Sequence, residues 1–176
     1  MAGAVEKSVK RMLRTRGALA AAVTALSVGL AIAVARVLIT LIELEPFAGV
    51  LFGLLTGVLP FTVGYFIGLW VVAPITEQLG VGHVITRSIL ATGIGATLWF
   101  VVLGLTGVVG AVAASSDVLG IAASPGLIGA QLGYALQEAL VGLVVLLPIG
   151  VLGGVLQWVW RTAHPAEHHI EGLIDV

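Results

Sequence analysis

The chain has 176 residues, of which 59% are hydrophobic and 10% are charged, and its mean hydropathy is +1.16. An ordinary soluble domain carries about 25% charged residues, so this composition excludes a water-soluble fold. The net charge of −1 gives no bulk attraction to nucleic acid or to acidic substrates. The lack of cysteine excludes disulfides, thiolate catalysis and cysteine-ligated metals.

The first apolar segment covers 17–35 and has no charged residue. The core of a secretory signal has about 7 to 15 apolar residues, which is shorter than this segment. We therefore predict a retained first helix over 17–42, preceded by a basic cytoplasmic N-terminus at 1–16. The basic residues of that N-terminus are Lys7, Lys10, Arg11, Arg14 and Arg16.

Three further apolar segments are long enough to cross a bilayer. The hydrocarbon core is about 30 Å thick and a helix rises about 1.5 Å per residue, so roughly 20 apolar residues make one crossing. We predict helices over 47–73, 88–114 and 127–160. With the first helix they form an all-α integral membrane four-helix bundle over 17–160, and a histidine-containing tail follows at 161–176.

Basic residues predict how the chain is threaded. Lys and Arg near the ends of membrane helices are retained on the cytoplasmic side. The basic N-terminus, Arg87 after the second helix and Arg161 after the fourth all fall on one side of a four-crossing bundle. We predict a multi-pass protein of the cell membrane with both termini in the cytoplasm. Trp70, Trp158 and Trp160 then lie at the cytoplasmic interface, where the indole N–H groups reach water.

The second and fourth predicted helices each contain a Leu-Pro pair, ending at Pro60 and Pro148, that a tryptophan follows ten residues later. This pattern leaves open a duplication, with two parallel helical hairpins. Each proline frees the carbonyl four residues earlier, at Thr56 and Val144, inside hydrocarbon where water cannot compensate. Such helix breaks either form a midplane site, as in transporters, or are kinks whose carbonyls neighbouring groups cover.

Small residues recur every four positions along the first two predicted helices. Membrane helices associate by close backbone approach, which ridges of small residues permit. We predict that the first two helices pack along these ridges and that the surplus of small faces supports self-association or contact with other membrane subunits. The alternative is that glycine is simply common in membrane helices. The helix-packing residues are Gly17, Ala21, Ala25, Gly29 and Ala33, and then Gly49, Gly53, Gly57, Gly64 and Gly68.

Charged residues inside the predicted helices are few. Arg36 lies twenty residues after Arg16, and Glu138 lies twenty residues before Trp158 on the oppositely running fourth helix, so both reach the outer interface at similar depth. They can form an interhelical ion pair within a polar cluster that also contains Gln131, Tyr134 and Gln137. The cluster predicts either a gate or binding site or ordinary anchoring by side chains that snorkel to water.

The histidines fall on the predicted cytoplasmic side. The tail sequence His-Pro-Ala-Glu-His resembles a spacing that can bring two imidazoles to one zinc ion on a helix, although Pro165 and the lack of an enclosed site weaken the match. We predict no cofactor, with a divalent transition metal at the tail as the alternative. The residues of that metal site would be His83, His164, Glu167, His168 and His169.

The sequence has no lysine-containing phosphate loop, no Ser–His pair within the membrane helices and no paired carboxylates there. These absences favour a protein that is not an enzyme. The leading hypothesis is a small membrane protein that acts by helix association, as a homo-oligomer or as an accessory subunit of a membrane complex. The alternatives are a small transporter or channel with a midplane site and a metal-binding protein that uses its tail.

Overall fold

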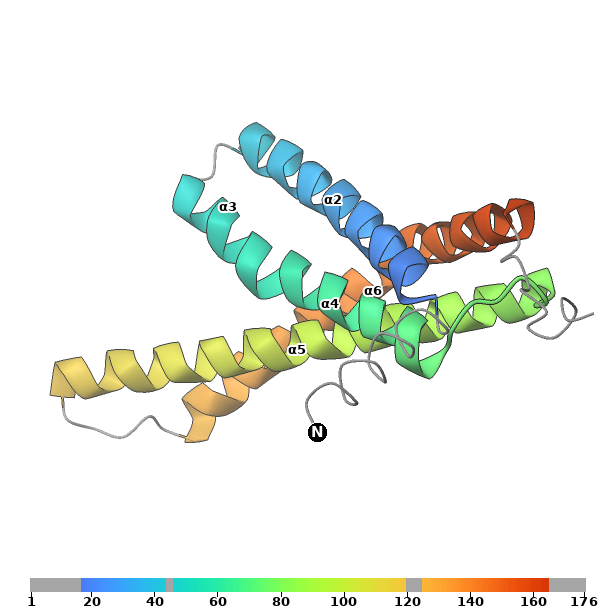
Figure 1. The fold of residues 1–176 in the computed structure, drawn as a ribbon. Helices are drawn as coiled ribbons and strands as arrows, with labels where there is room; N and C mark the ends of the chain where they lie inside the picture. The colour runs from blue at the N-terminus through green and yellow to red at the C-terminus, as the bar shows by residue number, and fades with distance from the viewer. Residues whose placement is uncertain (1–16, 44–45, 120–124, 165–176) are drawn as a thin grey trace, which may run out of the picture.

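The structure is a computed structural model, and it describes residues 17–43, 46–119 and 125–164. Every regular element within these ranges is a helix (Figure 1). The first is α2 (Ala18–Glu43). The last two are α5 (Val81–Leu119) and α6 (Pro125–Ala163). Between α2 and α5 the chain runs through four consecutive helical segments. They are α3 (Phe47–Gly53), η1 (Leu54–Val58), α4 (Leu59–Ile67) and η2 (Gly68–Val72).

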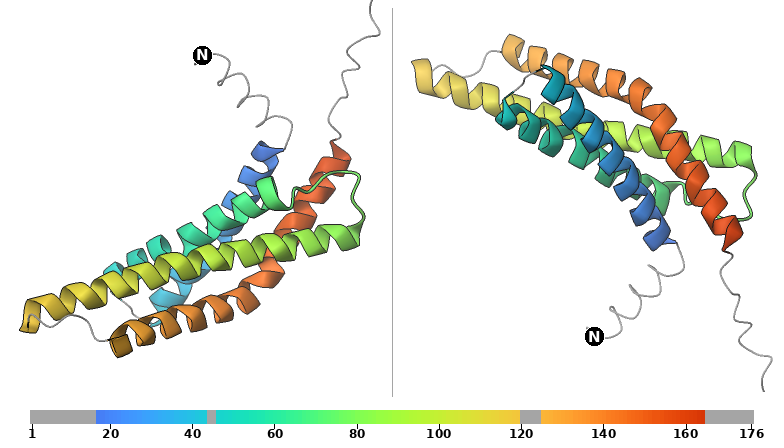
Figure 2. Two further views of the ribbon diagram at one scale, coloured as in Figure 1. Left: turned by 90° about the horizontal axis from the view of Figure 1, so that it is seen from below. Right: turned by 90° about the horizontal axis from the view of Figure 1, so that it is seen from above.

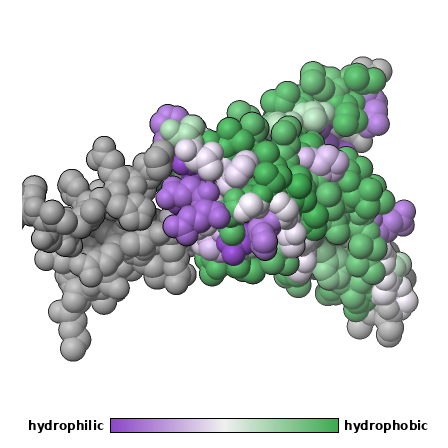
Figure 3. Space-filling view, turned by 90° about the vertical axis from the view of Figure 1, so that its right-hand side faces the viewer, coloured by the Kyte–Doolittle hydropathy of each residue, from purple (hydrophilic) through white to green (hydrophobic). Residues whose placement is uncertain are grey.

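The described residues contain four helical stretches that are long and apolar enough to cross a membrane, which confirms the predicted set of four apolar helices. Their outer surface is largely hydrophobic. Hydrophilic patches are visible in Figure 3, which views the molecule from the right-hand side of Figure 1. The helices α5 and α6 have 39 residues each. At about 1.5 Å per residue each is nearly twice as long as the hydrocarbon core is thick, so parts of both extend beyond the lipid tails or tilt strongly within them.

The ends of α5 differ from the predicted range of 88–114. The helix begins at Val81, where the carbonyl of Gly80 accepts hydrogen bonds from the backbone N–H groups of His83 and Val84. The predicted range left His83 in the loop before this helix, whereas the structure has it in the first turn of α5. Hydropathy marks the part of a helix that lipid surrounds, whereas polar residues can extend the same helix into water.

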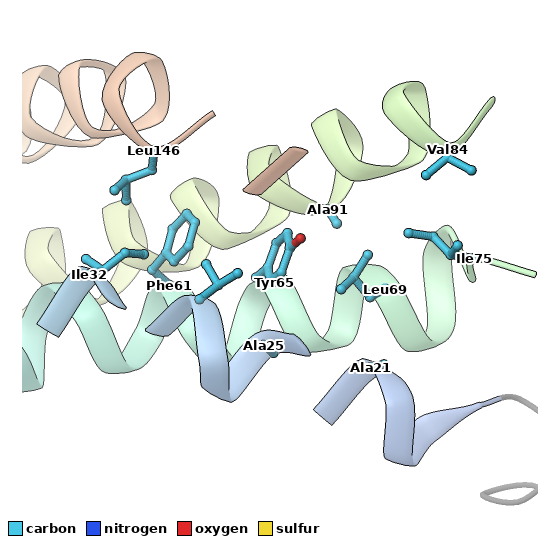
Figure 4. Close-up of a cluster of buried hydrophobic side chains, with 11 residues drawn as sticks. Ala21, Ala25, Ile32, Phe61, Tyr65, Leu69, Ile75, Val84, Ala91 and Leu146 are labelled. Atoms are coloured by element: carbon cyan, nitrogen blue, oxygen red, sulfur yellow. The ribbon is translucent and has the colours of Figure 1, made fainter. Parts of the chain in front are cut away.

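The core lies where α2, α4, α5 and α6 converge (Figure 4). Phe61, Tyr65 and Leu69 of the second span are fully buried there, and the rings of Phe61 and Tyr65 stack with centroids 6.0 Å apart. Small side chains of α2 and α5 allow the backbones to approach these large residues. The small residues at this core include Ala21, Ala25 and Ala91.

The small-residue ridges have two different partners. The sequence predicted that the ridges of the first two helices pack on each other, and Gly29 of α2 does lie against Thr62 of α4. Gly64, however, faces Gly95 of α5 so closely that a Cβ on Gly64 would lie 2.8 Å from the Gly95 Cα atom. Gly68 also faces α5. The second span therefore uses its later glycines to pack on α5, because that is where α4 and α5 run side by side.

Two arginines organise the end of the bundle at which η2 stops. Arg87 of α5 donates a hydrogen bond to the carbonyl of Pro74, and Arg161 Nη1 donates one of 2.7 Å to the carbonyl of Ile75. The Arg161 guanidinium also lies against Gly17, whose φ of 65° favours glycine. The beginning of α2 and the end of α6 are therefore at the same end of the bundle.

The two proline positions are not equivalent. Pro60 is buried two residues after the end of the π-helical segment η1, and the N–H of the intervening Leu59 donates to the carbonyl of Leu54, five residues earlier. Pro148 is exposed inside the continuous helix α6, which changes direction along its length (Figure 2). An interior proline removes one backbone hydrogen bond and bends a helix. The structure thus accommodates one proline by a change of register and the other within a bent helix.

Trp160 is exposed, whereas Trp70 and Trp158 differ from the interfacial role that the sequence predicted. The indole nitrogens of Trp70 and Trp158 are buried and have no hydrogen-bond partner among the described residues. Trp70 stacks on Phe66 with ring centroids 5.4 Å apart. The prediction that these two N–H groups reach water is therefore wrong, because both rings pack against the core instead.

Candidate functional site

A cavity of about 300 Å³ lies between α2, the second span, α5 and α6. It occupies the half of the bundle that is nearer to the end of α2 and the start of α3, away from Arg161. Its polar lining comes from Arg36 on α2, Thr56 on η1, and Tyr134 and Glu138 on α6. Its apolar lining includes Phe61, Trp99 and Leu146. The cavity therefore combines a charged region with an apolar region inside a membrane-spanning bundle.

The Arg36 side chain lies beside Gly53 at this cavity. The Arg36 side chain is exposed, and a Cβ on Gly53 would lie 3.4 Å from its Nε atom. The missing side chain at Gly53 thus leaves room for the guanidinium beside the end of α3. Gly49, another residue of the predicted packing ridge, lines the same cavity. Glycines predicted for helix packing therefore line this cavity as well.

Of the polar cluster that the sequence predicted, Arg36, Tyr134 and Glu138 line the cavity. Glu138 is half-buried, and Tyr134 is 55% exposed. Gln131 instead lies at the contact with α5, where a Cβ on Gly107 would be 3.0 Å from its Oε1 atom. Gln137 is exposed and does not line the cavity. The direct ion pair between Arg36 and Glu138 stays a prediction.

Thr56 connects the cavity to the π-helical segment. Its side chain is buried, and its hydroxyl donates a hydrogen bond of 2.8 Å to the carbonyl of Phe52. Thr56, Gly57 and Val58 all line the cavity immediately before Pro60. Single π-helical turns inside α-helices occur frequently at functional sites, because the wider turn changes which groups face inward. The first of the two predicted helix breaks therefore lies at this cavity.

The second predicted helix break lies elsewhere. Val144 is 73% exposed, Pro148 is exposed as well, and neither lines the cavity. The neighbouring residues Val145 and Leu146 do line it. Residues close to each of the two prolines therefore line the cavity, but Val144 and Pro148 do not, and a midplane site that both helix breaks form stays a prediction.

Trp99 is the cavity residue that sequence reasoning missed. Its indole ring lies between two glycines of neighbouring helices, so that a Cβ on Gly57 would be 3.2 Å from Nε1 and a Cβ on Gly142 would overlap the ring. The signal for it was present, because Trp99 falls in the middle of the third apolar segment, where anchoring at an interface does not explain a tryptophan. It forms the wall between η1 and α6.

The predicted metal site is not assembled within the described residues, which contain no group of three or more metal-ligating side chains. His83 and His164 are both exposed. The His164 ring stacks on Trp160 with centroids 5.4 Å apart. Glu167, His168 and His169 lie outside the described residues, so metal binding by the tail stays a prediction.

Comparison with family models, with curated proteins and with solved structures gives no match for this chain.

Proposed function

We propose that this protein is a small multi-pass membrane carrier that binds an amphipathic molecule in the cavity between its four spans. The observation that supports this most directly is that Arg36 and Glu138, from helices at opposite ends of the sequence, line one cavity together with Thr56. Ionisable residues inside membrane-spanning helices are costly to bury, and they commonly mark pathways for substrates or ions.

The lining suggests how a ligand is oriented. The polar group of the ligand lies at the end of the cavity formed by Arg36, Tyr134 and Glu138. Arginine supplies a cationic donor there, glutamate an anionic acceptor and tyrosine a neutral hydroxyl. Its apolar part lies against Phe61 and Trp99, which supply hydrophobic surface and an aromatic face. A zwitterionic head group matches this pair of opposite charges better than a singly charged one, because each charge of the ligand then meets its opposite.

A stability screen with single-chain amphiphiles of equal tail length and zwitterionic, cationic or anionic head groups tests the proposal. We expect zwitterionic compounds to raise the melting temperature of the wild type and to lose this effect in Glu138→Gln and Arg36→Gln. The matched control is Glu43→Gln, because Glu43 is exposed on α2 and does not line the cavity. Equal stabilisation of the wild type and the two cavity variants would contradict cavity binding.

Uptake of the stabilising compound into proteoliposomes then tests carriage across the membrane. The wild type and Glu43→Gln should transport it, and Glu138→Gln should not. If the compound binds without being transported, the protein is a membrane receptor and not a carrier.

Helix association is the second candidate function, and it has one specific observation in its favour. Gly129 and Gly133 are exposed on one face of α6 and have no other part of the described chain within 4 Å of an added Cβ. Small residues four positions apart permit a second helix to approach closely. Crosslinking in native membranes tests this surface, since Gly133→Leu should abolish a homo-oligomer or a partner contact and Gly82→Leu should not.

We also propose that the end with Arg87 and Arg161 faces the cytoplasm of a cell membrane, with both termini on that side. The support is that Arg161 lies against Gly17, where the basic N-terminal sequence joins α2, and that Arg161 and Arg87 bind the neighbouring carbonyls of Ile75 and Pro74. Because the chain has no cysteine, a single cysteine at residue 3 or at residue 172 can be labelled alone in intact cells. Labelling of either by an impermeant reagent would contradict this orientation.

A further inference from the structure

A second concave surface lies between α2 and α6, in the half of the bundle that contains Arg161. This groove has a volume of about 460 Å³, and none of the described side chains that line it is charged. Its walls are mainly aliphatic, with Leu19 and Val23 on α2 and Leu152 and Leu156 on α6. The groove does not share a lining residue with the cavity around Arg36 and Glu138.

The groove has the length of one bilayer leaflet. On α2 its lining extends from Leu19 to Ala31, and on α6 from Ile149 to Trp160. Twelve residue steps from 19 to 31 correspond to about 18 Å of helix, and half of the hydrocarbon core is about 15 Å thick. An acyl chain of one leaflet therefore matches the groove in length and in polarity.

One polar side chain inside the groove has an unmet hydrogen-bonding requirement. Gln157 lines the groove, is only 4% exposed, and its Oε1 atom has no hydrogen-bond partner among the described residues. A buried amide without a partner costs about 1 to 3 kcal/mol. A 180° flip exchanges the amide oxygen and nitrogen, so Gln157 can meet either a hydroxyl or an ester carbonyl of a ligand. The hydroxyl of Ser27 is exposed in the same groove.

The mouth of the groove is basic. Arg161 follows the lining residue Trp160, and its guanidinium lies against Gly17, two residues before the lining residue Leu19. Arg161 lies one helical turn beyond Gln157. In the sequence, five further Lys and Arg residues precede Gly17 within ten positions, outside the described residues. Basic clusters next to a membrane helix attract anionic lipid head groups, and a guanidinium binds phosphate well.

We propose that this groove binds one anionic phospholipid, with an acyl chain between α2 and α6, the glycerol-ester region at Gln157 and the phosphate at Arg161. The lipid satisfies the buried amide and fills the space where α2 and α6 diverge. It stabilises the association of α2 with the rest of the bundle. The observation behind this is the coincidence of an apolar leaflet-length groove, an unpartnered buried amide and a basic mouth along one line.

Native mass spectrometry of the full chain tests the proposal after reconstitution in an equimolar mixture of phosphatidylcholine and phosphatidylglycerol. We expect the extracted wild type to retain phosphatidylglycerol preferentially. Ser27→Phe fills the groove and should reduce retention by about tenfold or more, which corresponds to about 1.4 kcal/mol. Leu26→Phe is the matched control, because Leu26 is the adjacent exposed residue and does not line the groove.

Gln157→Leu gives an independent readout that does not depend on how Ser27→Phe folds. In detergent without lipid, this variant should melt higher than the wild type, since it removes the unpartnered amide. In vesicles that contain phosphatidylglycerol the advantage should disappear, because the lipid then satisfies Gln157. An equal advantage in both conditions, equal retention of the two phospholipids, or unchanged retention in Ser27→Phe would each overturn the proposal.

Discussion

The phenolic hydroxyl of Tyr65 donates a hydrogen bond of 2.5 Å to the carbonyl of Gly150, and it thereby joins α4 to α6 across 85 residues of sequence. Both groups are buried in the core, where Tyr65 stacks near Phe61 (Figure 4). A Cβ on Gly153 would lie 3.2 Å from the Tyr65 hydroxyl oxygen, so the glycine at this position leaves room for the hydroxyl. This bond connects the first half of the chain to the second.

We expect Tyr65→Phe to destabilise the folded bundle by about 1 to 2 kcal/mol, because it leaves the Gly150 carbonyl without this donor. Thermal unfolding of the reconstituted protein measures the change. Tyr134→Phe is the control, since the Tyr134 ring is exposed and its loss of a hydroxyl should leave stability almost unchanged. Equal melting temperatures for Tyr65→Phe and the wild type would show that the hydrogen bond does not hold the halves together.

Gly95→Ala should destabilise the contact between α4 and α5 by about 1 to 3 kcal/mol, the usual cost of overpacking. A Cβ at Gly95 would lie 2.9 Å from the carbonyl oxygen of Phe61, and backbone atoms cannot move aside independently of their helix. Gly93→Ala, two residues away on the same helix, has nothing within 4 Å of the added Cβ among the described residues. It should be neutral or slightly stabilising. The comparison fails if both substitutions have the same effect on the melting temperature.

Arg161→Gln should lower stability by about 1 to 2 kcal/mol in detergent without anionic lipid. The substitution removes the charged donor that holds the Ile75 carbonyl and the packing of the guanidinium on Gly17. Thr162→Ala, at the adjacent exposed position, should have little effect. Protease cleavage of the segment that follows η2 provides the measurement, because this segment should become accessible in Arg161→Gln only.

Hydropathy was sufficient to predict four apolar helices, because lipid requires long segments without charge whose backbone groups bond internally. It did not predict where α5 begins, since His83 and Arg87 are compatible with a helix that continues outside the lipid. The π-helical hydrogen bonding before Pro60 could not be predicted from the sequence either. A proline shows which backbone donor is missing. The packing of Gly57 against Trp99 that accompanies the π-helical segment depends instead on how the second span and α5 lie against each other.

At the candidate site, too, the sequence predicted one property and not another, namely the depth of the residues but not the direction of their side chains. Counting residues placed Arg36 and Glu138 at similar depth, and the structure has both in the lining of one cavity. The direction of a side chain around its helix depends on packing that depth alone does not specify. Successive residues differ by about 100° around a helix, and so Glu138 faces the cavity whereas Gln137 faces away from it.

Cysteine accessibility in proteoliposomes tests the central claim most directly, which is that the bundle contains a cavity accessible to a ligand. The chain has no cysteine, so Val145→Cys and Val144→Cys each introduce a single thiol. Both side chains are more than half exposed in the protein alone, but only Val145 lines the cavity. We predict that a water-soluble maleimide labels Val145→Cys much faster than Val144→Cys. Equal labelling rates for the two thiols would contradict the account.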